Sequence, residues 1–249
     1  MIAVRDIWKR FGEHLVLRGV SFDVLSGETL VVLGKSGGGK SILLKLIVGL
    51  LRPDDGSIVI DGHDVVTMDY RQLQRVRSNF GFLFQGAALF DSLTVRDNIA
   101  LALRRRAKYT EHELDERVTF ALSMVGLEGV ERELPASLSG GMKKRVGLAR
   151  AIAPNPRYIL YDEPTTGLDM ETADGINLLI NELRAKLGVT SIVVTHDIHS
   201  AFVVGDRFVV LDEGVVLISG TRKEIESSRD EDVRKYINSS LSAGRVNPP

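Results

Sequence analysis

Short runs of apolar residues, many of them β-branched, recur along the chain and alternate with segments of helical periodicity. Such runs are typical of strands buried on both faces, and their alternation with helices predicts a mostly parallel sheet covered by helices. The expected strands are 27–34, 57–62, 80–84, 157–163, 190–197 and 207–214, and the clearest helices are 40–51, 171–187 and 197–204.

Three stretches depart from this alternation. Residues 2–11 and 14–25 alternate apolar and polar positions, which predicts an antiparallel β-layer with a turn at Gly12. After Thr221 the chain is polar, with helical character to about Asn238 and no regular structure expected over 239–249. The third stretch lies between Gln85 and Pro156 and predicts a helical subdomain inserted between two core strands, with helices at 94–106, 111–125 and 139–153.

Composition and charge limit the classes of protein that fit. Hydrophobic content of 44% and charged content of 26% are ordinary for a soluble globular protein, and a net charge of −1 gives no basic field for nucleic acid. The absence of cysteine excludes disulfides and thiolate metal sites. The most apolar run, residues 42–51, contains Lys45 and is about half the ~20 residues of a bilayer span. Residues 1–14 also lack the apolar stretch of a signal peptide, so we expect neither a signal peptide nor a membrane-spanning helix.

A glycine-rich segment, "VVLGKSGGGKS" (31–41), matches G-x-x-x-x-G-K-[ST] between an apolar strand and an apolar helix. Glycines permit positive φ angles, so backbone N–H groups can surround a phosphate, and the dipole of the following helix adds positive charge. Lys40 is expected to bridge β- and γ-phosphates, and the Ser41 hydroxyl to bind magnesium. A flexible turn is the alternative, and Lys35 is either solvated or in contact with phosphate. The predicted contacts are Gly34, Lys35, Ser36, Gly37, Gly38, Gly39, Lys40, Ser41 and Ile42.

Two carboxylates end the apolar run "YILYDEP" (158–164). We expect Asp162 to lie beside the phosphate loop and hold magnesium through water, and Glu163, which faces the other way, to orient the attacking water as general base. Gln85 and His196 also end apolar strands, so Gln85 is expected to reach magnesium and water, and His196 the γ-phosphate. Either residue alone is more commonly structural, but their shared location at strand ends favours a catalytic role.

A second helix start is rich in glycine. In "SLSGGMKKR" (137–145), Ser139 caps a helix whose first residues, Gly140 and Gly141, leave the backbone N–H groups uncovered. This arrangement predicts an anion site, and we expect the anion to be a γ-phosphate. Because the chain already has one phosphate loop, the second half-site makes sense if it serves a neighbouring subunit.

The motifs "GKSGGGKS", "FLFQ", "LSGGM", "YILYDEP", "TTGLD" and "VVTHD" resemble, in this order, those of the ATP-binding-cassette family over about residues 2–225. The resemblance implies a P-loop NTPase with a RecA-like core, which hydrolyses ATP with magnesium as a homodimer paired head to tail around two ATP molecules. It also implies that Ser139, Gly140 and Gly141 contact ATP in trans and that Asp169 lies at the dimer seam. Phe11 falls where the family places an aromatic that stacks on adenine, with a core phenylalanine as the alternative.

Met142, where the family's commonest pattern has glutamine, and "FLFQGAALFDSLTVRDNIALAL" (82–103) resemble one branch, the ATPases of Mla/Mce-type lipid transporters. That branch implies an ATPase at the cytoplasmic face of the inner membrane that powers phospholipid movement between membranes. Its implied partners are an integral permease, an MCE-domain lipid-binding protein and a small accessory protein. Residues 1–225 then form the nucleotide-binding domain, with the helical subdomain at about 86–155, and 226–249 form a C-terminal extension. Candidates to line a groove for a permease helix, or simply to be buried, are Ala87, Ala88, Leu89 and Phe90.

Two other functions compete with lipid transport. The chain could power an importer of a small solute, although "GAALFDSLTV" argues against this. It could also be a cassette ATPase that acts on DNA or ribosomes without a membrane partner, but such relatives usually carry two cassettes or a long inserted coiled coil. Neither feature is present, and the basic clusters 104–106 and 143–145 are interpreted as solvated helix faces. We expect no nucleic-acid partner.

Overall fold

The computed structural model describes the backbone of residues 1–104 and 109–243 and the side chains of this range up to Ile237. The chain forms two compact units: Met1–Val76 with Ile192–Pro249, and Arg77–Ser191. The first unit is therefore discontinuous in sequence, and the second is a single continuous segment.

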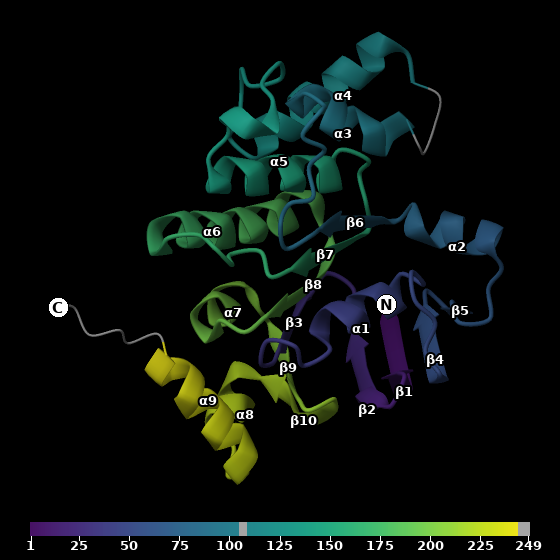
Figure 1. Ribbon diagram of the computed structural model, residues 1–249, viewed down its shortest axis with the longest axis vertical. Coiled ribbons are helices and arrows are strands. Elements are labelled where there is room, and N and C mark those ends of the chain that lie inside the picture. Colours follow the sequence, from purple (N-terminus) through teal and green to yellow (C-terminus); the bar gives the residue numbers. More distant parts are fainter. Residues whose placement is uncertain (105–108, 244–249) are drawn as a thin grey trace. The chain divides into compact units, whose positions relative to one another are not determined.

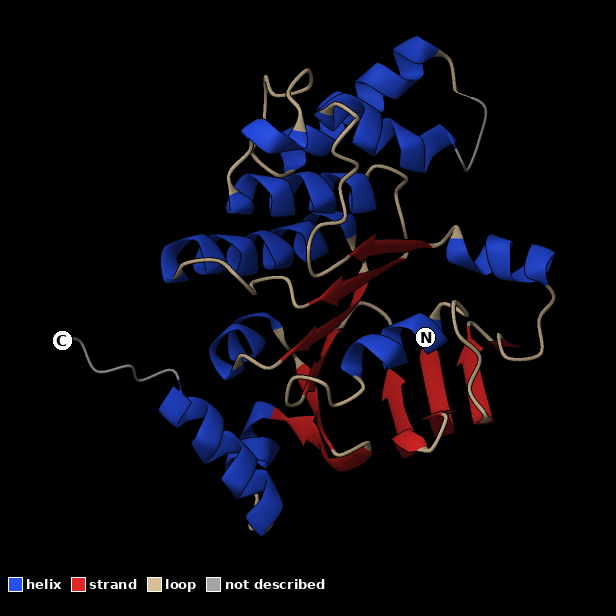
Figure 2. Ribbon diagram, viewed as in Figure 1, coloured by secondary structure: helices blue, strands red, loops and turns tan. Residues whose placement is uncertain are grey.

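The first unit contains an antiparallel sheet of β1 (Ile2–Phe11), β2 (His14–Val24), β4 (Asp55–Ile60) and β5 (His63–Asp64), in the order β2-β1-β4-β5 (Figures 1 and 2). The predicted hairpin is confirmed, because Phe11 pairs with His14 around Gly12, whose φ is +56°. One assignment was wrong. The run 57–62 belongs to this layer, since β4 pairs antiparallel with β1, and its half-exposed residues show that it is not buried on both faces.

The same unit contains β3 (Thr29–Leu33), which is buried along its whole length and pairs in parallel with β9 (Arg207–Asp212). β8 (Thr190–Thr195) follows β3 in the sheet order, and α7 (Ile198–Val204) packs on β3. β10 (Val215–Thr221), a strand that the sequence pattern did not predict, pairs antiparallel with β9. The ends of β3 and β8 lie at one edge, because the N–H of Gly34, just after β3, donates to the carbonyl oxygen of Thr195, the last residue of β8.

The remaining helices of the first unit are short, apart from the last. α1 (Lys40–Ile47) is shorter than the predicted helix, which extended to residue 51. Two residues after its end, Gly49 adopts a left-handed conformation that does not continue a helix. α2 (Tyr70–Arg77) and α8 (Arg222–Glu226) were not predicted separately. α9 (Glu231–Ala243) continues past Asn238, so the expectation of irregular structure fails for 239–243, and residues 244–249 lie outside the described part.

The second unit contains a parallel pair of strands, β6 (Phe80–Leu83) and β7 (Tyr158–Asp162). The chain between them forms α3 (Val95–Arg104), α4 (Glu111–Met124), a 3₁₀ turn at Pro135–Ser137 and α5 (Gly140–Ile152). α6 (Met170–Leu187) follows β7. The three predicted helices are present, although residues 105–106 of the first lie outside the described residues.

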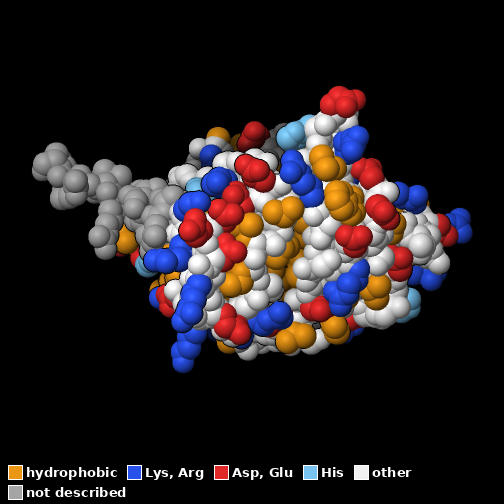
Figure 3. Space-filling model, turned by 90° about the horizontal axis from the view of Figure 1, so that it is seen from below, with side chains coloured by type: hydrophobic (Ala, Val, Ile, Leu, Met, Phe, Trp, Pro, Cys, Tyr) orange, Lys and Arg blue, Asp and Glu red, His pale blue; other side chains and the backbone are white. Residues whose placement is uncertain are grey.

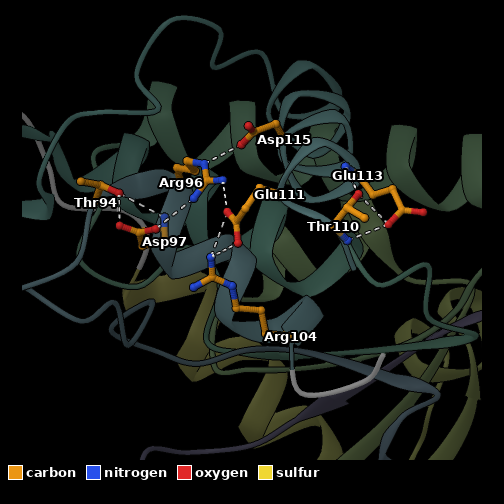
Figure 4. Close-up of polar contacts among 8 residues, drawn as sticks. All are labelled: Thr94, Arg96, Asp97, Arg104, Thr110, Glu111, Glu113 and Asp115. Carbon is orange, nitrogen blue, oxygen red and sulfur yellow. Dashed lines mark hydrogen bonds and ion pairs between the residues drawn. The ribbon is translucent and has the colours of Figure 1, made fainter. Parts of the chain in front are cut away.

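Charged side chains join α3 to α4 (Figure 4). Arg96 forms ion pairs with Glu111 at 2.8 Å and Asp115 at 2.5 Å, and Arg104 pairs with Glu111 at 2.9 Å. The hydrogen bond from Arg96 lowers the pKa of Glu111. A capping box at Thr110 begins α4, so this helix is fixed both at its start and along one side.

The described residues contain no helix that is both long and apolar enough to span a bilayer. On the face shown in Figure 3, basic and acidic side chains are interspersed among smaller apolar areas. That face therefore carries no extended field of one sign, in agreement with the net charge of −1.

Candidate functional site

The phosphate loop connects β3 to α1 in the first unit. Gly37 and Gly39 have φ angles of +81° and +90°. A Cβ at Gly34 would lie 2.5 Å from the Leu211 carbonyl oxygen, and one at Gly39 would lie 2.8 Å from Leu17 Cδ2. Left-handed backbone and lack of space both require glycine here, so the loop keeps its backbone uncovered for a ligand.

Lys40 is 5% exposed at the start of α1, and its ammonium donates hydrogen bonds to the carbonyl oxygens of Gly34 (2.7 Å) and Lys35 (2.9 Å). The ammonium is thus held inside the loop. The first turn of α1, which also carries Ser41 and Ile42, contains no acidic side chain. Positive charge and the helix N-terminus therefore act together, as binding of a phosphate requires.

A cavity of about 330 Å³ lies beside the loop. Ser36, Gly37 and Gly38 line it, together with β2 residues 14–16 and 18 and the turn at 212–214. Lys35, which is 63% exposed, forms an ion pair with Asp212 at 3.2 Å. The cavity-lining residues of β2 and of the turn were not predicted, because no sequence motif marks them. They reach the loop only because the Arg18 N–H donates to the Gly214 carbonyl oxygen and β9 pairs with β3.

Phe11 ends β1 with 46% of its surface exposed, which rules out the alternative of a core phenylalanine. The Lys9 ammonium lies 5.3 Å from the centroid of the Phe11 ring and forms an ion pair with Asp54 at 2.8 Å. The ring is therefore a surface aromatic that already interacts with a cation. Phe11 is not among the residues that line the cavity.

His196 follows β8 directly and is exposed. The residue before it, Thr195, accepts a hydrogen bond at its carbonyl oxygen from the Gly34 N–H, at 3.3 Å. The position of β8 beside β3 and this hydrogen bond thus bring His196 close in structure to the beginning of the phosphate loop.

In the second unit, Asp162 is the last residue of β7 and Glu163 follows it directly, and they are 6% and 7% exposed. Glu163 has a φ of +49°, unusual for a residue with a side chain, and its carboxylate accepts a hydrogen bond from Thr166 Oγ1 at 3.0 Å. The Gln85 and Glu163 carbonyl oxygens both accept hydrogen bonds from the Lys144 ammonium (the second at 3.1 Å). The structure therefore brings Gln85 and Glu163 together through a lysine.

Lys144 corrects the interpretation of the cluster 143–145 as a solvated helix face, because it is only 5% exposed. Burial lowers its pKa, and the charges of Glu163 and Asp162 oppose this shift. Arg145 also turns inward, donating to the Val125 carbonyl oxygen at 2.8 Å.

Ser139 caps α5, and its hydroxyl accepts a hydrogen bond from the Met142 N–H at 3.3 Å. A Cβ at Gly141 would lie 2.5 Å from Thr172 Cγ2, whereas one at Gly140 would meet only Leu168, at 3.4 Å. Packing thus explains the second glycine, while Gly140 is exposed.

Thr172 also connects this helix start to Asp169, since the Asp169 carboxylate accepts hydrogen bonds from its N–H (2.9 Å) and hydroxyl (2.8 Å). These bonds lower the pKa of Asp169 and cap α6. Ser139, Gly141 and Asp169 therefore lie in one cluster within the second unit.

The proposed groove residues differ in exposure. Ala87 is buried and Leu89 half-buried, whereas Ala88 and Phe90 are exposed. Ala87 is therefore a packing residue, and only the other three can contribute to a surface.

A loop of obligatory glycines between a buried parallel strand and a helix, with a lysine ammonium inside it, defines a P-loop nucleotide-binding protein. The family model "ABC transporter" matches residues 17–166, and the chain belongs to this family. It is an ATP-binding, ATP-hydrolysing subunit of an ABC transporter, with the ABC ATPase fold. Cassettes of this family dimerise and act with membrane permease subunits.

Three curated relatives are each 40% identical to the chain. The probable ribonucleotide transport ATP-binding protein mkl of Mycobacterium leprae aligns over 95% of this chain and 68% of its own length. The corresponding shares are 97% and 74% for TRIGALACTOSYLDIACYLGLYCEROL 3, a chloroplastic protein of Arabidopsis thaliana. They are 88% and 59% for the methionine import ATP-binding protein MetN of Brucella abortus.

Two solved structures are similar in fold. The dimeric ATP-binding cassette MJ0796, in a post-hydrolysis state with ADP and Pi, has a TM-score of 0.81 at 34% identity over 89% of this chain and 98% of that chain. The protein cbiO1 from Clostridium perfringens, part of the transporter complex cbiONQ, has a TM-score of 0.83 at 29% identity, covering 98% and 97%.

Proposed function

We propose that the chain is the ATPase of a complex that moves phospholipids between membranes. The observation that carries the proposal is the run 82–103, which resembles Mla/Mce-type ATPases. The relative named after trigalactosyldiacylglycerol, a glycolipid, supports it, because alignment with that protein covers more of both chains than alignment with MetN.

Within this function each predicted residue has a role. The phosphate loop, including Lys35, Ser36, Gly37, Gly38 and Ile42, holds the phosphates of ATP, with Lys40 between the β- and γ-phosphates. Phe11 stacks on adenine, Glu163 orients the attacking water, and His196 binds the γ-phosphate. In a head-to-tail homodimer, Ser139, Gly140 and Gly141 bind ATP held by the partner subunit, with Asp169 at the seam.

Magnesium fits the donors that the chain offers. Ser41, Gln85 and Asp162 supply a hydroxyl, an amide oxygen and a carboxylate, the oxygen ligands that this cation prefers. When bound, magnesium neutralises charge on the phosphates. The chain's own residues bind and orient ATP, and Glu163 accepts the proton of the water.

The remaining assignments concern the assembly. Residues 1–225 form the nucleotide-binding domain, with the helical subdomain at about 86–155, and 226–249 form a C-terminal extension. The chain lies at the cytoplasmic face of the inner membrane and associates with a permease, an MCE-domain protein and a small accessory protein. Ala88, Leu89 and Phe90 contribute to the surface that receives the permease, and the exposure of Ala88 and Phe90 supports this role.

The catalytic role is tested with Glu163→Gln. Loss of a general base costs about 10²–10⁴-fold in rate, so we expect ATP hydrolysis to fall by at least about 100-fold while ATP binding and dimerisation persist. Turnover is measured by phosphate release, binding by titration with ATP, and dimerisation by light scattering. Hydrolysis at the parental rate would show that Glu163 is not the general base.

The cargo is tested by gentle purification of the chain from its native membranes, followed by mass spectrometry of the co-purifying proteins and lipids. An MCE-domain protein, a multi-span permease and bound phospholipid are expected. A small-solute importer is the second candidate, supported by the similarity to MetN, and a solute-binding protein in the sample would favour it. Recovery without any of these partners would contradict both assignments of cargo.

A further inference from the structure

A single face of α5 contacts the backbone of the chain after β6. Lys144 donates to the Gln85 carbonyl oxygen, and Arg150 donates to the carbonyl oxygens of Ala87 and Ala88. Between them, Gly147 is so close to Leu83 and Ala87 that a Cβ would lie 2.7 Å from Leu83 Cδ1. The segment that begins at Gln85 is thus fastened to α5 by its main chain.

Of Lys144 and Arg150, Lys144 also bonds to the residue that follows β7. Its ammonium reaches the Glu163 carbonyl oxygen at 3.1 Å as well as the Gln85 carbonyl oxygen. The backbone of Glu163 has a φ of +49°, a conformation that costs free energy unless neighbouring groups hold it. A buried, charged donor on this carbonyl oxygen fixes the peptide orientation, and with it the direction of the Glu163 side chain.

The geometry points to Lys144 as a positioning residue for ATP hydrolysis. It holds the main chains of Gln85 and Glu163 in one fixed arrangement, so that the amide and the carboxylate are aimed at the same attacking water. This inference rests on the proposed roles of Gln85 and Glu163. It assigns to Lys144 no contact with ATP, so its loss acts on the rate of the chemical step and not on nucleotide affinity.

Burial is consistent with this role. A lysine that is 5% exposed loses hydration, which lowers its pKa, and two backbone carbonyl oxygens and the charges of Glu163 and Asp162 compensate for part of that loss. Arginine at this position keeps the charge and the donors, whereas methionine keeps only the length and apolar character of the side chain.

The test compares Lys144→Met and Lys144→Arg in the full chain, with Lys143→Met as a control, because Lys143 is the adjacent, half-buried lysine of the same helix. Steady-state hydrolysis of Mg-ATP gives kcat and KM, titration gives the Kd for ATP, and thermal unfolding gives Tm. Misplacement of a catalytic group by about 1 Å can cost on the order of 100-fold, so we expect Lys144→Met to lower kcat by about 10- to 100-fold with an unchanged Kd. Lys144→Arg should recover most of the rate, and Lys143→Met should match the parental chain.

Three results would overturn the inference. The first is an unchanged kcat in Lys144→Met. The second is a fall in both the Tm and the ATP affinity of Lys144→Met, without recovery of the rate in Lys144→Arg, because a lysine with a purely structural role would give that pattern. If Lys144→Met does not fold, Lys144→Gln replaces it, because glutamine keeps an N–H donor on a shorter side chain. We then expect a parental Tm with a reduced kcat. The third overturning result is a parental kcat in Lys144→Gln. Glu163→Gln, measured in parallel, distinguishes failure of the proposed function from failure of this inference. If Glu163→Gln hydrolyses ATP at the parental rate, Glu163 is not the general base. If Glu163→Gln is inactive while Lys144→Met is fully active, only the role of Lys144 is wrong.

Discussion

Two glycines within helices allow a direct test of how closely α5 packs against the end of β6 and the residues that follow it. Gly147 lies inside α5, where a Cβ would lie 2.7 Å from Leu83 Cδ1 and 3.3 Å from Ala87 Cβ. Gly175 lies inside α6, where the nearest atom to such a Cβ is Arg145 Nη2 at 3.5 Å, an ordinary contact. Gly147→Ala and Gly175→Ala therefore make the same chemical change, the first at a crowded position and the second at a position with room for a methyl group.

The expected magnitudes follow from opposing effects. Alanine is favoured over glycine in a helix interior by about 0.8–1.0 kcal/mol, so Gly175→Ala should raise the free energy of unfolding by nearly this amount. At Gly147 the same gain is opposed by overpacking, which costs about 1–3 kcal/mol. Leu83 is fully buried and Ala87 is 1% exposed, so neither side chain can move out of the way. The unfolding free energy of the Gly147 variant should be lower than that of the Gly175 variant by about 1–3 kcal/mol.

Urea denaturation followed by circular dichroism measures both variants beside the parental chain. Equal slopes of free energy against urea concentration show that the midpoints report stability. An equal gain in the two variants would refute the reasoning, because it would mean that α5 is not held against Leu83 and Ala87. A loss at Gly175 would show instead that α6 is more closely packed than described.

Three further predictions follow from other parts of the structure. Phe11→Ala should weaken ATP binding by about tenfold, as expected for loss of a stacking aromatic, whereas Phe11→Tyr should keep the affinity; calorimetric titration distinguishes stacking from no contact. Leu148→Ala, at a fully buried position of α5, should lower the unfolding free energy by about 2–5 kcal/mol, and a loss well below this range would mean that the site is not close-packed. Because Arg96 lowers the pKa of Glu111, their pairing stabilises the fold above the ordinary glutamate pKa and is lost as the pH falls through the lowered one. The stability difference between the parental chain and Arg96→Met should therefore shrink in acid, and a difference that is independent of pH would contradict the pairing.

Local patterns predicted much of the fold because local rules determine it. β3 and β7 are fully buried, so their unbroken apolar runs could be recognised, and the φ angles of the phosphate loop demand the glycines that mark it. β10 was missed because it is half-exposed and has no regular alternation. The sheet to which β4 belongs could not be predicted, because membership depends on pairing with β1, from Trp8 with Asp55 to Ile2 with Ile60, which are far apart in the sequence.

In the candidate site, too, some features could be predicted from local sequence and others could not. Asp162, Glu163 and Gln85 follow strands that were recognised, and the structure places each at a strand end or just beyond it. Lys144 was missed because a buried lysine and a solvated lysine look alike in a basic cluster. A helical signal was nevertheless present, since Lys144 lies on the face of α5 that carries the buried residues Gly141, Leu148 and Ala151. The basic residues next to Lys144 in the sequence suggested that its side chain is exposed to solvent, whereas the residues on the same face of the helix indicated that it is buried.

The split of the first unit across the sequence has a consequence for synthesis on the ribosome. β3 is buried along its whole length, but the Thr29 N–H finds its acceptor, the Asp206 carboxylate, only 177 residues later. At about 5–20 residues per second, β3 emerges roughly 10–35 s before β9 can pair with it. During that interval β3, which is apolar, is not paired with β9. The second unit, which is one continuous segment, can fold during the same time. Nascent chains that stop before Ile192 should therefore need chaperones, and completion of the C-terminal strands should be the step that releases them.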